Sequence, residues 1–201
     1  MTASKKVDTR ILTMTGIMIA ITAVMSFTPL GSIPTPWATI TIAFLPTIVA
    51  AMSIGFWPAV AVGGSAGLFS LIRATYVVSI LQPFLLNPLI SVLPRIMVGV
   101  VVFLMFRALM GMKVSKFIAA PVSAAIGGIT NTVMVLGGVW LLYGAAANEA
   151  TLAADSPNFT TFWTFIVFVV TTNAIVEVIG YTILGGAIVL GLDRAKFLRK
   201  K

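Results

Sequence analysis

The stretch that decides the fold of this chain spans residues 38–72 and reads ATITIAFLPTIVAAMSIGFWPAVAVGGSAGLFSLI. It contains no charged side chain. As one helix it would be about 50 Å long, well beyond a bilayer core of about 30 Å. Gly55 and Pro58 mark the break in its middle, because Gly favours the end of a helix and Pro the start of the next. The stretch therefore predicts two membrane-spanning helices, 38–55 and 57–73, joined by a tight turn.

The remaining sequence has the same apolar character. Hydrophobic residues make up 59% of the 201 residues and charged residues 9%, whereas soluble domains carry roughly 25% charged residues. We therefore expect an all-α integral membrane protein that forms a single membrane domain over residues 1–201. Its six transmembrane helices are predicted at about 11–27, 38–55, 57–73, 95–110, 117–143 and 159–192. Residues 73–94 are expected to form a structured loop and residues 145–158 a polar loop.

Positive charge is distributed unevenly along the chain, whose net charge is +8. With the N-terminus in the cytoplasm, eleven of the thirteen Lys and Arg residues fall on the inner side of the six-helix layout, as the positive-inside rule requires. We therefore expect both termini to be cytoplasmic. Apolar stretches of membrane length separate the basic residues, so the charge does not indicate a nucleic-acid partner.

The chain contains neither cysteine nor histidine, which removes thiolate nucleophiles, disulfides, and the commonest metal ligand and general base. Glu177 is the one acidic residue expected inside the membrane. Intramembrane proteases need paired acids, Ser with His, or a metal, and this sequence offers none of these sets. We expect a protein that is not an enzyme, with no catalytic residue, no bound metal and no cofactor.

Rows of small residues recur in three of the predicted helices, where they allow helix backbones to approach closely. They comprise Gly16, Ala20 and Ala23 in the first, Ala59, Gly63 and Gly67 in the third, and Ala120, Ala124, Gly128 and Thr132 in the fifth. Each row suits either packing inside the bundle or docking against a partner membrane subunit. The first helix is the best candidate for docking.

Polar side chains at membrane depth need partners or a purpose, since a charge at the bilayer centre costs roughly 2.5–3.5 kcal/mol even on a lenient scale. The candidates are Asn87, Arg95, Asn131, Asn173, Glu177 and Tyr181, with Trp37 in the proline-rich loop after the first helix. We expect them to line one pocket open to the outside, formed by the fourth to sixth helices and the outer loops. The alternative is an ion pair between Arg95 and Glu177, with the Asn side chains as hydrogen-bonding links between helices.

Over nearly its whole length, the layout of the chain resembles the substrate-binding S component of energy-coupling-factor (ECF) vitamin transporters. The resemblance rests on the row Gly16, Ala20 and Ala23, the long loop after it, and the segment TIAFLPTIVA at 41–50. A short link between the second and third helices, a glycine-rich third helix and the segment NPLISVLPR at 87–95 also match. The Pro-Arg pair in this last segment is most like that of pantothenate-type members.

This resemblance implies a six-helix protein of the bacterial cytoplasmic membrane that captures a small vitamin from outside. It implies a transmembrane scaffold subunit as a partner, contacted by Gly16, Ala20 and Ala23, and two cytoplasmic ATPases. The resemblance also implies that those partners use the ATP, and the lack of a Walker A motif in this chain agrees with that expectation.

The candidate residues also suggest a substrate. Arg95 suits a carboxylate, which Arg binds in a bidentate fork, and Asn87, Asn131 and Asn173 suit amide and hydroxyl groups. Pantothenate matches this set best, biotin is second, and riboflavin is a further alternative. An unpaired Glu177 would instead favour a cation such as thiamin or its pyrimidine precursor. The rival function is a proton-coupled secondary transporter with Glu177 as the proton carrier, although the sequence has no detectable internal repeat of the kind common in such transporters.

Overall fold

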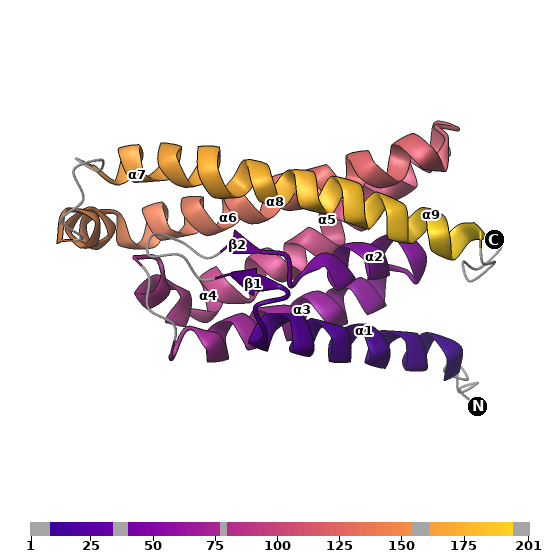
Figure 1. Cartoon of the computed structure of the whole chain (residues 1–201), viewed down its shortest axis with the longest axis horizontal. Helices are drawn as coiled ribbons and strands as arrows, with labels where there is room; N and C mark the ends of the chain where they lie inside the picture. The colour runs from indigo at the N-terminus through magenta and orange to yellow at the C-terminus, as the bar shows by residue number, and fades with distance from the viewer. Residues whose placement is uncertain (1–8, 34–39, 77–79, 154–160, 195–201) are drawn as a thin grey trace, which may run out of the picture.

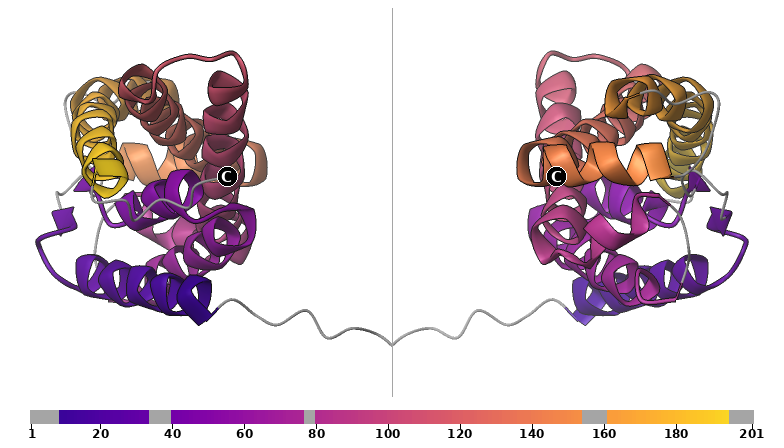
Figure 2. Two further views of the ribbon diagram at one scale, coloured as in Figure 1. Left: turned by 90° about the vertical axis from the view of Figure 1, so that its right-hand side faces the viewer. Right: turned by 90° about the vertical axis from the view of Figure 1, so that its left-hand side faces the viewer.

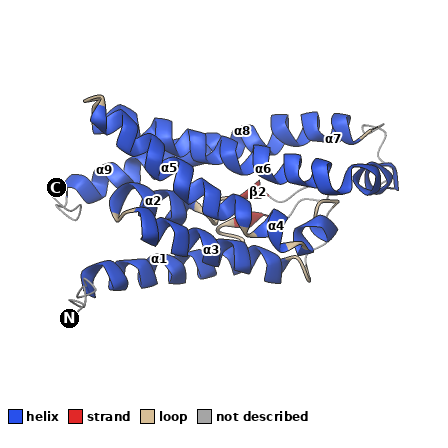
Figure 3. Ribbon diagram, turned by 180° about the vertical axis from the view of Figure 1, so that it is seen from behind, coloured by secondary structure: helices blue, strands red, loops and turns tan. Residues whose placement is uncertain are grey.

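The computed structural model describes residues 9–33, 40–76, 80–153 and 161–194. These residues form a bundle of long helices that run along one axis, with one two-stranded sheet between them (Figures 1 and 3). The elements of the first half are α1 (Thr9–Phe27), β1 (Ser32–Ile33), β2 (Ile40–Thr41), α2 (Leu45–Ser53), α3 (Phe56–Arg73) and the short 3₁₀-helix η1 (Gln82–Leu86). Those of the second half are α4 (Pro88–Ser91), α5 (Leu93–Gly111), α6 (Lys116–Ala153), α7 (Phe162–Val169), η2 (Val170–Ala174), α8 (Ile175–Gly180), η3 (Tyr181–Gly185) and α9 (Gly186–Arg194).

Five helical stretches in the described part of the chain are long and apolar enough to cross a membrane. They are α1, α3, the α4–α5 unit Pro88–Gly111, α6, and the α7–α9 unit Phe162–Arg194. Large apolar side chains such as Leu12, Val133 and Ile183 are exposed on their outer surfaces, as expected of side chains that face lipid. The chain is therefore an all-helical membrane protein apart from its small sheet.

The predicted helix over 38–55 differs most from the structure. α2 begins only at Leu45 and has nine residues, which gives a length of about 14 Å, too short to cross a bilayer. The residues before it form a β-hairpin in which Thr41 pairs with Ser32, and Ile40 with Ile33. Alternation of Thr and Ile at 39–42 is typical of a strand, and this signal outweighs the apolar run. In Figure 1 the hairpin lies midway along the bundle, and α2 continues from it toward the end where α1 begins.

The predicted polar loop over 145–158 is in part helical. α6 continues to Ala153, with a kink at Tyr143, whose φ is −135° and ψ is 22°. Alanine has the highest helix propensity of all residues, and the segment after the kink is rich in alanine. Figure 2 shows this last segment of α6 lying across one end of the bundle.

Small residues bring α3 and α5 into close contact. A Cβ added to Gly63 would lie 2.5 Å from the backbone oxygen of Arg95, and one added to Gly67 would lie 2.5 Å from the Cα of Val92. Ala59 is fully buried, and a Cβ added to Gly99 would lie 2.8 Å from its backbone oxygen. The row Ala59, Gly63 and Gly67 therefore serves packing inside the bundle.

The core consists of two clusters of buried apolar side chains. One cluster contains side chains of α2, α3, α5, α6, η3 and α9, among them Ile48, Val102 and Tyr181. The other joins η1, α4, α6 and α7 around Ile90, Val139 and Phe165. Ala120 and Ala124 belong to the first cluster, so the row on α6 also faces inward.

α1 begins and α9 ends at the same end of the bundle, where the connection between α5 and α6 also lies (Figures 1 and 3). Lys116 at the start of α6 forms an ion pair of 2.5 Å with Asp193 near the end of α9. This arrangement gathers Lys113, Lys116 and Arg194 at one end. That this end lies in the cytoplasm stays a prediction.

We expect Gly63→Ala to destabilise the protein, because the added Cβ meets backbone that cannot rotate away. Overpacking of this kind costs about 1–3 kcal/mol, more than the gain of up to about 1 kcal/mol from helix propensity. The measurement is the thermal unfolding midpoint of the purified protein in detergent. Gly16→Ala on α1 is the matched control, since its added Cβ has nothing within 4 Å. An equal or higher midpoint for Gly63→Ala would contradict the close packing of α3 on α5.

Candidate functional site

A cavity lies between the two core clusters, and its walls come from almost every helix. Its polar walls comprise Ser26 of α1, Ser32 and Thr41 of the hairpin, Ser70 and Arg73 of α3, Gln82 of η1, Arg95 of α5, Asn131 and Thr132 of α6, Asn173 of η2, and Glu177 of α8. The cavity thus places a set of polar groups among mostly apolar walls.

Arg95 lies in the first turn of α5, directly after Pro94, which suits the first turn of a helix because it has no N–H to leave unpaired. Its side chain is only 7% exposed. Nη1 donates a hydrogen bond of 3.0 Å to the backbone oxygen of Ile90 in α4. Within the described ranges, Lys116 and Asp193 form the one ion pair, so Arg95 and Glu177 face the same cavity without being joined directly.

Two asparagines line the cavity from neighbouring helices. Asn131 is 8% exposed, and its Oδ1 has no hydrogen-bond partner among the residues that the structure describes. Asn173 lies in the π-helical turn η2, and its Oδ1 is 3.5 Å from the hydroxyl of Thr172. Such turns are rare and occur often at functional sites. A buried amide oxygen without a partner is costly, so binding of a ligand donor by Asn131 would remove that cost.

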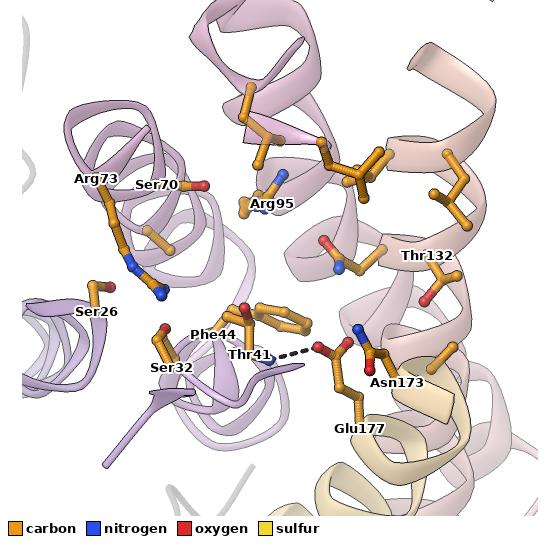
Figure 4. Close-up of a pocket in the computed structure, with 18 of the residues that line it drawn as sticks. Ser26, Ser32, Thr41, Phe44, Ser70, Arg73, Arg95, Thr132, Asn173 and Glu177 are labelled. Carbon is orange, nitrogen blue, oxygen red and sulfur yellow. Dashed lines mark hydrogen bonds between the residues drawn. The ribbon is translucent and has the colours of Figure 1, made fainter. Parts of the chain in front are cut away.

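Glu177 holds the hairpin against the helices. Its Oε1 accepts a hydrogen bond of 2.5 Å from the backbone N–H of Thr41, shown as a dashed line in Figure 4. One turn further on, the hydroxyl of Tyr181 donates to the backbone oxygen of the same Thr41, and the ring of Tyr181 packs on Phe44 at 4.5 Å between centroids. Both polar groups of the Thr41 backbone are therefore bound by side chains of the last helical unit.

The structure brings four of the predicted site residues together in this cavity: Arg95, Asn131, Asn173 and Glu177. Tyr181 lies beneath it, fully buried. Asn87 lies outside, where its Oδ1 caps α4 and its Nδ2 donates to the hydroxyl of Tyr143 at 3.0 Å. Trp37 falls outside the described residues. Ligand binding by each of these residues stays a prediction.

Several cavity residues were missed from the sequence. Arg73 was not among the predicted site residues, because the six-helix layout places it, like Arg95, at or just below the outer surface. Ser32 and Thr41 were missed because the hairpin was not predicted. The sequence did contain a sign that Arg73 could belong to the site. Arg73 is a lone charge that follows 35 uncharged residues, and Arg95 was selected as a candidate for a similar reason.

The small-residue row on α1 faces away from the bundle. Gly16 and Ala20 are exposed and Ala23 is half-buried, and a Cβ added to Gly16 would meet nothing within 4 Å. The end-on views of Figure 2 place α1 at the edge of the bundle. This row differs from those on α3 and α6, whose small residues are covered by their own bundle.

The family model for the substrate-specific component of ECF transporters matches residues 10–189. The chain belongs to this family. Its fold is similar to that of the solved structure of ThiT from Listeria monocytogenes, with a TM-score of 0.61 and 19% identity over 92% of this chain and 95% of that chain. Among curated proteins, none matches the sequence. An ECF substrate-specific component is a substrate-binding subunit of a membrane transporter and not an enzyme, as the sequence predicts.

We expect Tyr181→Phe to loosen the hairpin while the ring still packs on Phe44. Loss of one hydrogen bond costs about 1 kcal/mol, so amide exchange in peptides covering residues 40–44 should quicken roughly fivefold. Exchange in α5 peptides should not change, and hydrogen-exchange mass spectrometry in detergent measures both. Tyr143→Phe, which removes the bond from Asn87, is the control and should leave residues 40–44 unaffected. Unchanged exchange in Tyr181→Phe would show that Glu177 alone holds Thr41.

Proposed function

We propose that this chain captures pantothenate from outside a bacterial cytoplasmic membrane for ATP-driven import. In this proposal six segments cross the membrane, with the hairpin and α2 together as the second crossing. Both termini lie in the cytoplasm, on the side of Lys113, Lys116 and Arg194. The cavity then opens toward the outside.

The observation that carries the proposal is the buried amide oxygen of Asn131 without a partner, in a cavity that also contains Arg95, Asn173 and Glu177. A bundle that needed these residues only for packing would pair them with one another. The hydrogen-bonding capacity that Asn131 leaves unused, beside three other polar side chains in one cavity, supports a small polar ligand.

Pantothenate carries a carboxylate, an amide and two hydroxyl groups. The described residues that line the cavity include two guanidinium groups, on Arg73 and Arg95, and one carboxylate, on Glu177. This excess of positive charge favours an anionic vitamin. The carboxylate of Glu177 already accepts the N–H of Thr41, which weakens the argument for a cationic ligand.

Other ligands stay as alternatives. Biotin also carries a carboxylate and is second. Thiamin or its pyrimidine precursor would use Glu177 as the counter-charge, and riboflavin would use the amide and hydroxyl groups. No cofactor is proposed for the chain itself, because ATP is used by two partner ATPases.

The first test is binding of a panel of B vitamins to the protein purified alone in detergent, measured by thermal shift and isothermal titration. We expect pantothenate to bind at nanomolar to micromolar concentration. Arg95→Gln should weaken that binding by about ten- to hundredfold, the value of a hydrogen bond to a charged group. No binding of any vitamin by the wild-type protein would overturn the proposal.

The exposed row Gly16, Ala20 and Ala23 is proposed as the contact with the transmembrane scaffold subunit. We expect Gly16→Leu to leave vitamin binding intact and to stop uptake when the chain is reconstituted with the scaffold and ATPases, because the larger side chain separates the two backbones. Gly137→Leu on α6 is the matched control, since its added Cβ also has nothing within 4 Å. Uptake unaffected by Gly16→Leu, or equally lost in both variants, would contradict this contact.

The rival function, proton-coupled secondary transport with Glu177 as the proton carrier, makes a different prediction. It requires uptake by this chain alone in proteoliposomes, driven by a pH gradient and lost in Glu177→Gln. We expect no such uptake, because the proposal assigns energy coupling to the ATPases.

A further inference from the structure

The polar walls of the cavity are divided between two sides. Figure 4 shows Ser26, Ser32 and Arg73 on one side, Asn173 and Glu177 on the other, and Thr41 with Phe44 between them. The first side comes from α1, the hairpin and α3, and the second from the last helical unit. A ligand that fills the cavity therefore contacts two different sets of groups.

The two arginines differ in the partners that the fold already supplies. Arg95 donates to the backbone oxygen of Ile90. Arg73 forms neither an ion pair nor a side-chain hydrogen bond with any residue in the described ranges. It is half-buried at the end of α3, and its guanidinium is directed toward Ser32 in Figure 4.

Ser32 is the second part of this group. It is 4% exposed, and its Oγ has no hydrogen-bond partner among the described residues. Burial of a hydroxyl without a partner is unfavourable, and Ser32 lines the cavity beside Arg73. A guanidinium and a buried hydroxyl, both unpartnered and on one wall, are the donors that a carboxylate requires.

The two sides of the cavity also differ in negative charge. Three carboxylates lie within the described segments. Asp193 pairs with Lys116 at the far end of the bundle, and Glu149 is exposed on α6 outside the cavity lining. Glu177 lines the cavity on the side opposite Arg73 (Figure 4). An anion bound at Arg73 therefore gains the attraction of the guanidinium and avoids direct repulsion from Glu177.

We propose that Arg73 and Ser32, with Ser26 beside them, form an anion subsite that binds the carboxylate end of the ligand. Arg95 and Asn131 then hydrogen-bond the neutral amide and hydroxyl groups at the other end. This assignment rests on the proposed vitamin binding and refines it, because it transfers the carboxylate from Arg95 to Arg73. Arg73 becomes the residue that selects an acid over its neutral analogue and disfavours a cation.

The test compares pantothenate with pantothenol, in which an alcohol replaces the carboxylate, by isothermal titration of the purified full chain in detergent. The wild-type protein should bind the acid more tightly. Arg73→Gln should weaken pantothenate binding by about ten- to hundredfold and pantothenol binding far less. Arg95→Gln should weaken both to a similar extent, and Arg73→Lys should keep part of the preference for the acid because it keeps the charge.

Arg107→Gln is the matched control, because Arg107 is exposed on α5 and lies outside the cavity lining. It removes the same charge and should change neither affinity. Thermal unfolding midpoints of all variants without ligand show whether a loss of binding comes from misfolding. If Arg73→Gln proves unfolded, Ser32→Ala replaces it and should weaken the acid selectively by severalfold.

The outcomes separate this inference from the proposed function. Equal weakening of acid and alcohol by Arg73→Gln, or selective loss of the acid in Arg95→Gln, overturns the subsite while vitamin binding stands. Binding of thiamin or riboflavin with no carboxylate vitamin overturns it as well. If biotin binds in place of pantothenate, biotin and biotinamide serve as the pair, with the same expected result. No binding of any vitamin by the wild-type protein defeats the proposed function itself.

Discussion

The structure depends on the requirement that backbone polar groups at membrane depth find partners, because hydrocarbon supplies none. Helices meet this requirement within themselves, but the extended hairpin before α2 does not. The backbone groups that face the partner strand are satisfied by the ladder between β1 and β2 and by the bond from Ile42 N–H to the backbone oxygen of Gly31. Thr41, whose N–H and C=O face the last helical unit, needs the carboxylate of Glu177 and the hydroxyl of Tyr181. Irregular backbone inside a membrane is tolerated where it lines a cavity, and here the hairpin and the cavity occur together.

This requirement also explains why the last helical unit differs from the others. Glu177 and Tyr181 lie four residues apart on one face, so both reach the same residue of the hairpin. The π-helical turns η2 and η3 lie on either side of α8. Each such turn shifts the face that the following residues present. The same segment therefore holds the hairpin through Glu177 and Tyr181 and places Asn173 in the cavity wall.

The sequence predicted the membrane class, most of the helices and four residues of the cavity, and the physical reason is the same in each case. Apolar length identifies a spanning helix, and polar residues such as Asn131 and Glu177 are conspicuous within one. The hairpin was not predicted, because an apolar run of this length was interpreted as a helix, although its first residues alternate Thr and Ile. The bond between Thr41 and Glu177 joins residues 136 positions apart, and no local pattern indicates such a pair. Arg73 was placed correctly at the end of its helix, but its direction toward the cavity depends on how α3 rotates against α5, which the glycine contacts determine.

The groups open to a ligand are those that remain after the needs of the fold are met. Glu177 is the one acidic residue that the sequence predicts inside the membrane, yet one of its oxygens accepts the N–H of Thr41. Arg95 is the most prominent cation, yet it donates to Ile90. After these bonds are counted, the groups of the cavity wall that have no partner among the described residues include Asn131 Oδ1, Ser32 Oγ and the guanidinium of Arg73. In the proposed site, selectivity is expected from an acceptor on α6 and a pair of donors on the hairpin and α3, which together suit an elongated, anionic molecule.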